Sequence, residues 1–132
     1  MINAIAHLCI SVNDLRTMED FYVQKLGLSK AFDDIDENGR LNSIYLRVGN
    51  RAFIEMFGDR AAGDGKGQAY CHICLEVDDM AKTVAEIRAR GAEVSEPKLG
   101  KDNSWQAWIS DPDGNNIELH SYTKESRQTP HL

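Results

Sequence analysis

The sequence predicts an α+β fold in which two βαβββ modules form a curved mixed sheet. Three observations predict it: an internal repeat, the same order of elements in each half, and a glycine-rich link between the halves. Residues 6–15 (AHLCISVNDL) recur 65 positions later as residues 71–80 (CHICLEVDDM), and residues 52–56 recur as residues 115–119. One such module is too small to bury a sufficient core alone, so we expect the two halves of this 132-residue chain to form one domain together.

The first module is predicted over residues 1–58. Residues 3–12 alternate as in a strand, and Asn13 and Asp14 are typical helix caps. Gly27 is placed to end the helix, whose apolar positions at helical spacing are Leu15, Met18, Phe21, Tyr22 and Leu26. Three strands should follow, with a turn between the first two; they lie at residues 28–33, 43–48 and 51–57, and the turn at 36–39.

The second module is predicted over residues 70–122, after a flexible link at residues 59–69. Its elements repeat the order of the first: a strand, a helix capped by Asp79 and ended by Gly91, and three further strands. We place the strands at 70–77, around 93–94, at 105–109 and at 116–121, with a loop at 96–103 and a turn at 111–114. The remaining residues, 123–132, are polar and are expected to form a loose tail.

The composition argues against several classes of function. The net charge of −6 argues against a nucleic-acid partner, which requires a basic surface, and no apolar run approaches the roughly 20 residues of a membrane span. The N-terminus shows no signal-peptide pattern, so we expect a cytoplasmic protein. Its three cysteines are expected to be reduced. Cys71 and Cys74 should face opposite sides of a strand, which suits neither a zinc knuckle nor a redox pair.

Each half carries one His on its opening strand and one Glu on its closing strand. These residues are His7 and Glu55 in the first half, and His72 and Glu118 in the second. Each Glu stands between two apolar residues, so the period of two turns it away from the helix layer. A carboxylate on a partly dry surface is costly unless a cation or partner compensates it. The repeated set therefore predicts one divalent metal site, for Ni, Zn, Co, Mn or Fe rather than Ca or Mg.

Other residues of these strands are expected to have ordinary roles. A lone His or Glu on a strand is usually a solvated polar residue, and only the repeat sets the four above apart. Trp105 and Trp108 fall on opposite faces by their spacing, so at most one lines the site. His120 shares a face with Glu118 and could reach substrate, but we expect it at the fringe of the cleft mouth; Cys9 and Cys74 are expected to fill space beside the histidines.

The same residues resemble those of a known family. Residues 3–122 resemble the vicinal oxygen chelate superfamily, which includes glyoxalase I, extradiol dioxygenases, methylmalonyl-CoA epimerase, and fosfomycin and bleomycin resistance proteins. The segments that carry the resemblance are His7 with VNDL at 12–15, FY at 21–22, LGL at 26–28, His72 with EVDD at 76–79, and DPDGN at 111–115 leading into IEL at 117–119. The resemblance implies paired βαβββ modules around a metal cleft.

Within this superfamily, the His-Glu-His-Glu pattern is most similar to that of glyoxalase I. The resemblance implies that His7, Glu55, His72 and Glu118 bind the divalent metal. It implies a lyase or isomerase that acts on a small α-hydroxy carbonyl or hemithioacetal substrate through a metal-bound enediolate. A ligand carboxylate would be the base, with Glu118 the first candidate and Glu55 the second. A homodimer is implied as well, with the site either shared between chains or formed within one.

Three further residues are candidates for binding the small-molecule substrate. Where glyoxalase I typically has an Arg that grips the glutathione carboxylate, this chain has Ser11, and Glu76 takes the equivalent place in the second half. Arg47 is a candidate to substitute for that Arg in part, because it lies on the strand face opposite Ile44, Leu46 and Val48. A carboxylate at the position of Glu76 does not favour an anionic tripeptide, so we predict that the glutathione hemithioacetal is a poor substrate.

Other functions within and beyond the superfamily remain as alternatives. An extradiol dioxygenase uses two His and one carboxylate and keeps coordination positions open, one of which Glu55 would fill. An epimerase and an antibiotic thiol transferase are further enzymatic alternatives. A metal-free protein that binds a drug is an alternative from another class, although such proteins typically lack the four ligands that this chain retains.

Overall fold

The computed structural model describes residues 4–58 and 71–132. The chain divides into two compact units, residues 1–68 and 69–132. The link predicted at residues 59–69 lies outside the described residues, and so does residue 70, where a strand was predicted to begin. Across the described part of the chain, no helix is both long enough and apolar enough to cross a membrane.

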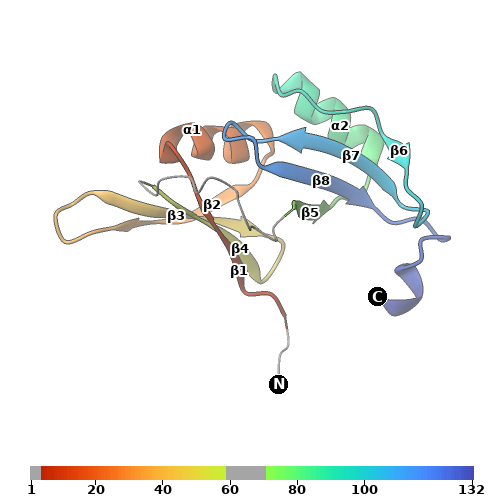
Figure 1. Ribbon diagram of the computed structural model, residues 1–132, viewed down its shortest axis with the longest axis horizontal. Helices are drawn as coiled ribbons and strands as arrows, with labels where there is room; N and C mark the ends of the chain where they lie inside the picture. The colour runs from red at the N-terminus through yellow and green to blue at the C-terminus, as the bar shows by residue number, and fades with distance from the viewer. Residues whose placement is uncertain (1–3, 59–70) are drawn as a thin grey trace. The chain divides into compact units, whose positions relative to one another are not determined.

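The first unit combines one helical segment with a four-stranded sheet (Figure 1). Its elements in chain order are β1 (His7–Ser11), α1 (Leu15–Glu19), η1 (Asp20–Lys25), β2 (Ser29–Ile35), β3 (Leu41–Val48) and β4 (Ala52–Phe57). The strand order is β1-β4-β3-β2, in which β1 is parallel to β4 and the other neighbours are antiparallel. The first and last strands of the unit therefore lie side by side.

Local sequence signals start and end the helical segment of this unit. Asp14 is the N-cap, and its carboxylate accepts a hydrogen bond from the Thr17 backbone N–H at 2.7 Å. Gly27 ends the segment with a φ of 79°, in the left-handed region that favours glycine. The predicted helix is confirmed in position. Its second part, η1, is a π-helix that closes with a bond from the Leu26 N–H to the Phe21 carbonyl, five residues back.

One face of the first sheet carries the apolar core of the unit. The α1 helix contacts β3, and the buried side chains of the helical segment are Leu15, Met18, Phe21 and Tyr22. The sheet contributes side chains that are at most 1% exposed, namely Ile44, Leu46, Ile54 and Met56. Because side chains alternate along a strand, the residues between them, Tyr45 and Glu55, face the other side of the sheet.

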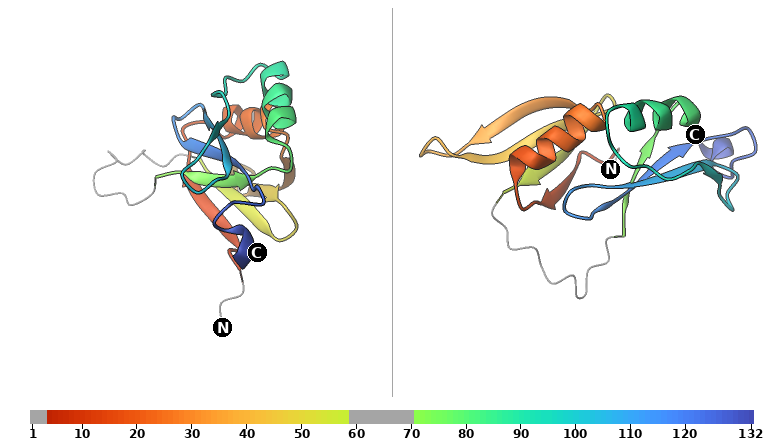
Figure 2. Two further views of the ribbon diagram at one scale, coloured as in Figure 1. Left: turned by 90° about the vertical axis from the view of Figure 1, so that its right-hand side faces the viewer. Right: turned by 90° about the horizontal axis from the view of Figure 1, so that it is seen from above.

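The second unit repeats this arrangement. Its elements are β5 (Ile73–Glu76), α2 (Met80–Ala89), β6 (Lys98–Leu99), β7 (Trp105–Ser110), β8 (Asn116–Ser121) and η2 (Thr129–His131). The strand order is β5-β8-β7-β6, again with the first strand parallel to the last. Figure 2 shows α2 lying over the sheet of its own unit, and α2 contacts β7 and β8. The two units thus share one βαβββ order and one sheet order, which confirms the predicted α+β fold.

The short strand of the second unit was predicted in the wrong place. It lies at Lys98–Leu99, inside the segment predicted as a loop, and not around residues 93–94. Its position follows from pairing with β7, because Lys98 lies opposite Gln106 and Leu99 lies opposite Trp105. A two-residue strand is defined by such a partner rather than by its own side-chain pattern.

The prediction of a loose tail is also wrong. Ser126 is only 2% exposed, and its hydroxyl lies 2.8 Å from that of Ser104. The Ser126 Oγ accepts a hydrogen bond from the Thr123 backbone N–H at 2.7 Å, and the Gln128 side-chain amide donates to Asp102 at 2.8 Å. The polar composition indicated solvation, but these groups instead satisfy polar atoms of the loop that precedes β7.

Candidate metal centre

The first unit places His7 and Glu55 together on the sheet face that points away from the helix. Glu55 lies opposite Cys9 of β1 and opposite Tyr45 of β3. His7 precedes Cys9 by two residues, so it lies on the same face of the strand. The His7 Nε2 is 3.4 Å from the Glu55 Oε2. Glu55 is only 8% exposed, so its carboxylate depends on these neighbours for compensation.

Tyr45 binds the other oxygen of Glu55. Its hydroxyl donates a hydrogen bond to the Glu55 Oε1, and its ring stacks on Phe32 with the centroids 4.4 Å apart. This bond keeps the proton on the phenol, and partial burial disfavours the phenolate, so the pKa of Tyr45 is raised to about 12. Glu55 is therefore fixed at both of its oxygens.

The second unit presents the equivalent pair, His72 and Glu118. The His72 Nε2 is 3.1 Å from the Glu118 Oε2, and Glu118 is 7% exposed. Cys74 and Trp108 lie opposite Glu118 on the two neighbouring strands. The Trp108 ring meets the His72 ring edge-on at a centroid distance of 5.0 Å. Of the two tryptophans, Trp108 shares the face of the His–Glu pair and Trp105 lies on the other face, as their spacing predicted.

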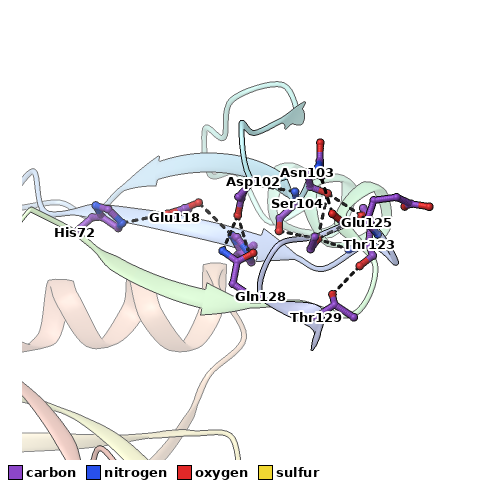
Figure 3. Close-up of polar contacts among 11 residues, drawn as sticks. His72, Asp102, Asn103, Ser104, Glu118, Thr123, Glu125, Gln128 and Thr129 are labelled. Carbon is purple, nitrogen blue, oxygen red and sulfur yellow. Dashed lines mark hydrogen bonds and ion pairs between the residues drawn. The ribbon is translucent and has the colours of Figure 1, made fainter. Parts of the chain in front are cut away.

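His120 lies directly against Glu118 and not at the fringe of the site. It is 6% exposed, and its Nδ1 is 3.2 Å from the Glu118 Oε1. Its Nε2 is 3.8 Å from the Asp102 Oδ2. Figure 3 shows the contact between His72 and Glu118, and the hydrogen bond that Gln128 donates to Asp102. The expectation failed because β8 is paired on both sides, which buries even its last residues.

The surroundings of Cys74 and Asp102 change their acidity in opposite directions. Cys74 is an exposed residue, yet partial burial of its thiol by neighbouring groups, together with the negative charge of the Glu118 carboxylate, raises its pKa to about 11. The hydrogen bond from Gln128 lowers the pKa of Asp102 below its ordinary value, with help from the Ser104 backbone N–H. At neutral pH, Cys74 therefore holds its proton and Asp102 carries its charge.

The three residues predicted to bind substrate lie in different environments. Ser11 is half-buried at the end of β1, on the face of His7. Arg47 is exposed, and its guanidinium donates to the Asn50 carbonyl at 3.3 Å. Glu76 is exposed and lies opposite His120 in the β5–β8 register. The structure therefore places Glu76 on the same sheet face as Glu118 and His120, while Arg47 makes a local turn contact.

Sequence reasoning missed the role of Tyr45, and it put His120 on the face of Glu118 but favoured a position at the fringe. Tyr45 contacts the Oε1 of Glu55 and His120 contacts the Oε1 of Glu118, which in each case is the oxygen that does not face the paired histidine. His120 follows Glu118 by two residues, so the period of two already put it on the right face. Tyr45 carried a weaker signal, because its contact depends on the β3–β4 register, which pairs Tyr45 with Glu55.

The donor atoms of each pair fit a shared divalent cation. Two ligand atoms at about 2.0–2.2 Å from one ion lie about 3.0–3.5 Å apart in octahedral or tetrahedral geometry. The Nε2–Oε2 distances of 3.4 Å for His7–Glu55 and 3.1 Å for His72–Glu118 meet this requirement. Imidazole nitrogens with carboxylate oxygens suit transition metals better than calcium or magnesium. The buried carboxylates and their histidines are therefore chemically suited to a metal of the predicted kind.

Residues 4–119 match the sequence pattern of the Glyoxalase/Bleomycin resistance protein/Dioxygenase superfamily. The chain belongs to this superfamily. It is 34% identical over 121 residues to a probable lactoylglutathione lyase of Vibrio cholerae, and the aligned part is 87% of this chain and 88% of that protein. It is 27% identical over 130 residues to the metallothiol transferase FosB of Staphylococcus epidermidis, and the aligned part is 96% of this chain and 87% of that protein.

Solved structures of the superfamily type share the fold. TnmS3, an antibiotic binding protein from Streptomyces sp. CB03234, is 25% identical and superposes with a TM-score of 0.75, covering 92% of this chain and 98% of that one. These similarities establish the superfamily and the fold of the chain, and its relatives include proteins named as lyase, as transferase and as binding protein.

Proposed function

We propose that the protein is a metal-dependent lyase or isomerase similar to lactoylglutathione lyase. One observation carries the proposal: each unit presents the same pair of a buried Glu and a more exposed His, with their nearest donor atoms 3.4 Å apart in one unit and 3.1 Å apart in the other. The identity of 34% to a probable lactoylglutathione lyase supports the same reaction class. In this proposal His7, Glu55, His72 and Glu118 hold one cation.

The chain's residues then divide the work of moving a proton between neighbouring carbons of an α-hydroxy carbonyl or hemithioacetal. A bound cation would stabilise negative charge on the two substrate oxygens. Glu118 takes the proton from one carbon and returns it to the next. Glu55 is the second candidate, because Tyr45 and His7 hold its two oxygens much as His120 and His72 hold those of Glu118.

The substrate proposal follows from the charges around the second pair. Glu76 lies opposite His120, two register positions from Glu118 and on the same sheet face, so it adds negative charge on the side of the proposed base. An anionic thiol adduct is disfavoured there. We therefore propose a neutral or cationic α-hydroxy carbonyl substrate, or an adduct of a neutral or cationic thiol, in preference to the glutathione adduct.

Proton exchange tests this function without knowledge of the natural substrate. Metal-loaded protein is incubated in D2O with a panel of α-hydroxy carbonyls and hemithioacetals, and deuterium entry at carbon is followed by NMR. We expect exchange with the native protein and at least a hundredfold loss in Glu118→Gln, with Glu55→Gln retaining more activity. Equal exchange in native protein and Glu118→Gln would remove Glu118 as the base.

A thiol transferase is the second candidate, because the similarity to the metallothiol transferase FosB spans 96% of the chain. A transferase joins a thiol to an electrophilic substrate and leaves a stable thioether, whereas an isomerase leaves composition unchanged. Mass spectrometry of the product separates the two. Metal content after purification separates both enzymes from a metal-free binding protein.

We also propose a homodimer in the cytoplasm, and subunit mixing tests how its sites are assembled. One variant carries His7→Ala with Glu55→Ala, and the other carries His72→Ala with Glu118→Ala. If sites are shared between chains, a heterodimer of the two has one intact site, and up to half of the native activity returns. If each site lies within one chain, mixing restores nothing.

A further inference from the structure

We propose that the second unit holds a separate site for a thiophilic divalent cation such as Zn²⁺, formed by Cys74, Glu118 and His120. The site requires no residue of the first unit. It goes beyond the proposed function, in which Cys74 and His120 have no part as ligands.

The sheet brings the three donor groups together. Cys74 of β5 lies opposite Glu118 of β8, and His120 follows Glu118 by two residues on the same face. One donor atom from each residue lies within 4.8 Å of the other two. The closest donors, the His120 Nδ1 and the Glu118 Oε1, are 3.2 Å apart, close to the separation of about 3.3 Å expected for two ligands on one tetrahedral ion.

The second ring nitrogen of His120, Nε2, has surroundings like those of metal-ligating histidines. Such a histidine usually directs its second ring nitrogen to a carboxylate or carbonyl, which fixes the ring and the tautomer. Among the described residues, the buried His120 Nε2 has no hydrogen-bond partner, and the Asp102 Oδ2 lies 3.8 Å from it. Ligation through Nδ1 would put the ring proton on Nε2, facing that carboxylate. Gln128 in turn orients Asp102 through a bond of 2.8 Å.

The donor set selects the class of metal. A thiolate, an imidazole and a carboxylate leave one position for water and match zinc and cobalt, whereas calcium and magnesium prefer oxygen alone. Cys74 is exposed, so a cation can reach the thiol from solvent.

The first unit offers a natural control. It has equivalents of Cys74 and Glu118, but no histidine at the position equivalent to His120. Cys9 lies opposite Glu55 just as Cys74 lies opposite Glu118. The residue two positions after Glu55 is Phe57, which supplies no ligand atom. The repeat therefore predicts a thiolate-containing site in one half only.

Occupation of this site has a consequence that rests on the proposed function. Glu118 would be shared, with Oε1 on the new cation and Oε2 beside His72. A carboxylate held in this way is a weaker base, so an excess of Zn²⁺ should inhibit the enzyme. The Cys74→Ser variant should resist that inhibition, measured against its own activity without added Zn²⁺.

The test is a titration of the metal-free, reduced protein with Co²⁺, because a thiolate bound to cobalt gives a charge-transfer band in the near ultraviolet. We expect the band in the native chain, saturating at about two added equivalents, because the four-residue centre of the proposed function takes up one of them. Cys74→Ser should abolish it, and His120→Asn should weaken cobalt binding at this site at least tenfold. The matched control Cys9→Ser should keep the band. A native protein without the band, or a band that survives Cys74→Ser or is lost in Cys9→Ser, would overturn the site.

The same titration separates this proposal from the proposed function. In the variant that carries His7→Ala with Glu55→Ala, the four-residue centre is destroyed but the band should remain. Loss of the band there would show that cobalt needs the first unit, which contradicts the site described here. Persistence of the band with loss of proton-exchange activity supports both proposals together, and circular dichroism confirms that each variant is folded.

Discussion

Replacing Tyr45 by Phe should weaken metal binding while leaving the fold of the first unit intact. The change deletes one oxygen. The ring keeps its stack on Phe32 at 4.4 Å and its edge contact with Phe53 at 6.4 Å, so packing is conserved. What is lost is the hydrogen bond to the Glu55 Oε1, which leaves one oxygen of a buried carboxylate without its donor.

The size of the effect follows from the position of Tyr45 behind a proposed ligand. Loss of an outer hydrogen bond to a metal ligand typically lowers metal affinity by about 10- to 100-fold. The ionised fraction of the Tyr45 phenol gives a second quantity that can be measured. With a pKa of about 12, about 1% of Tyr45 is ionised at pH 10, where an ordinary tyrosine is about half ionised.

Two measurements check this reasoning. Competition with a chromogenic chelator gives the metal affinity of the native protein, of Tyr45→Phe and of Phe32→Leu, a control that keeps the phenol and removes the stacked ring. The near-ultraviolet difference spectrum between native protein and Tyr45→Phe at pH 10 should show almost no phenolate. A Tyr45→Phe protein with native metal affinity, or a Tyr45 that is half ionised at pH 10, would refute the role assigned to the hydrogen bond.

Three further predictions concern the second unit. Ile117→Ala should cost about 2–5 kcal/mol, because the side chain is 0% exposed, whereas Ile117→Val should cost about 0.5–1.5 kcal/mol; urea unfolding measures both. Asp79→Ala should lower stability by about 1 kcal/mol in the same assay, because the carboxylate caps α2 through the Lys82 N–H at 2.9 Å. The folded-state pKa of Asp102 is lowered, so its contribution to holding the C-terminal segment is present above its unfolded pKa and is lost as pH falls through the folded value. The protection factors against hydrogen exchange at residues 126–131 should therefore fall in acid in native protein, and Asp102→Asn should show low protection factors already at neutral pH; an Asp102→Asn protein with native protection would contradict this.

The sequence allowed the repeat, the helix caps and the two glutamates to be identified because each depends on local chemistry. Asp14 and Asp79 cap helices through backbone groups three residues away. Glu55 could be assigned to a face because Ile54 and Met56 flank it, and alternation along a strand needs no knowledge of neighbouring strands.

The features that the sequence did not predict depend on partners distant in the chain. Tyr45 binds Glu55 because the β3–β4 register pairs them, and His120 is buried because β8 has a strand on each side. The C-terminal segment is ordered because Ser126 meets Ser104, 22 residues earlier. Composition alone describes such a segment as polar, and cannot tell a polar group that binds water from one that binds the protein.

The central claim is that two repeated His–Glu pairs bind one cation together, and metal stoichiometry tests it most directly. The measurement uses a Cys74→Ser background, which removes the proposed thiolate site, and determines bound Ni²⁺ or Zn²⁺ per chain by equilibrium dialysis. We predict about one tightly bound equivalent per chain, and its loss both in His7→Ala with Glu55→Ala and in His72→Ala with Glu118→Ala. Tight binding that survives removal of either pair would contradict the claim, because one pair would then be dispensable.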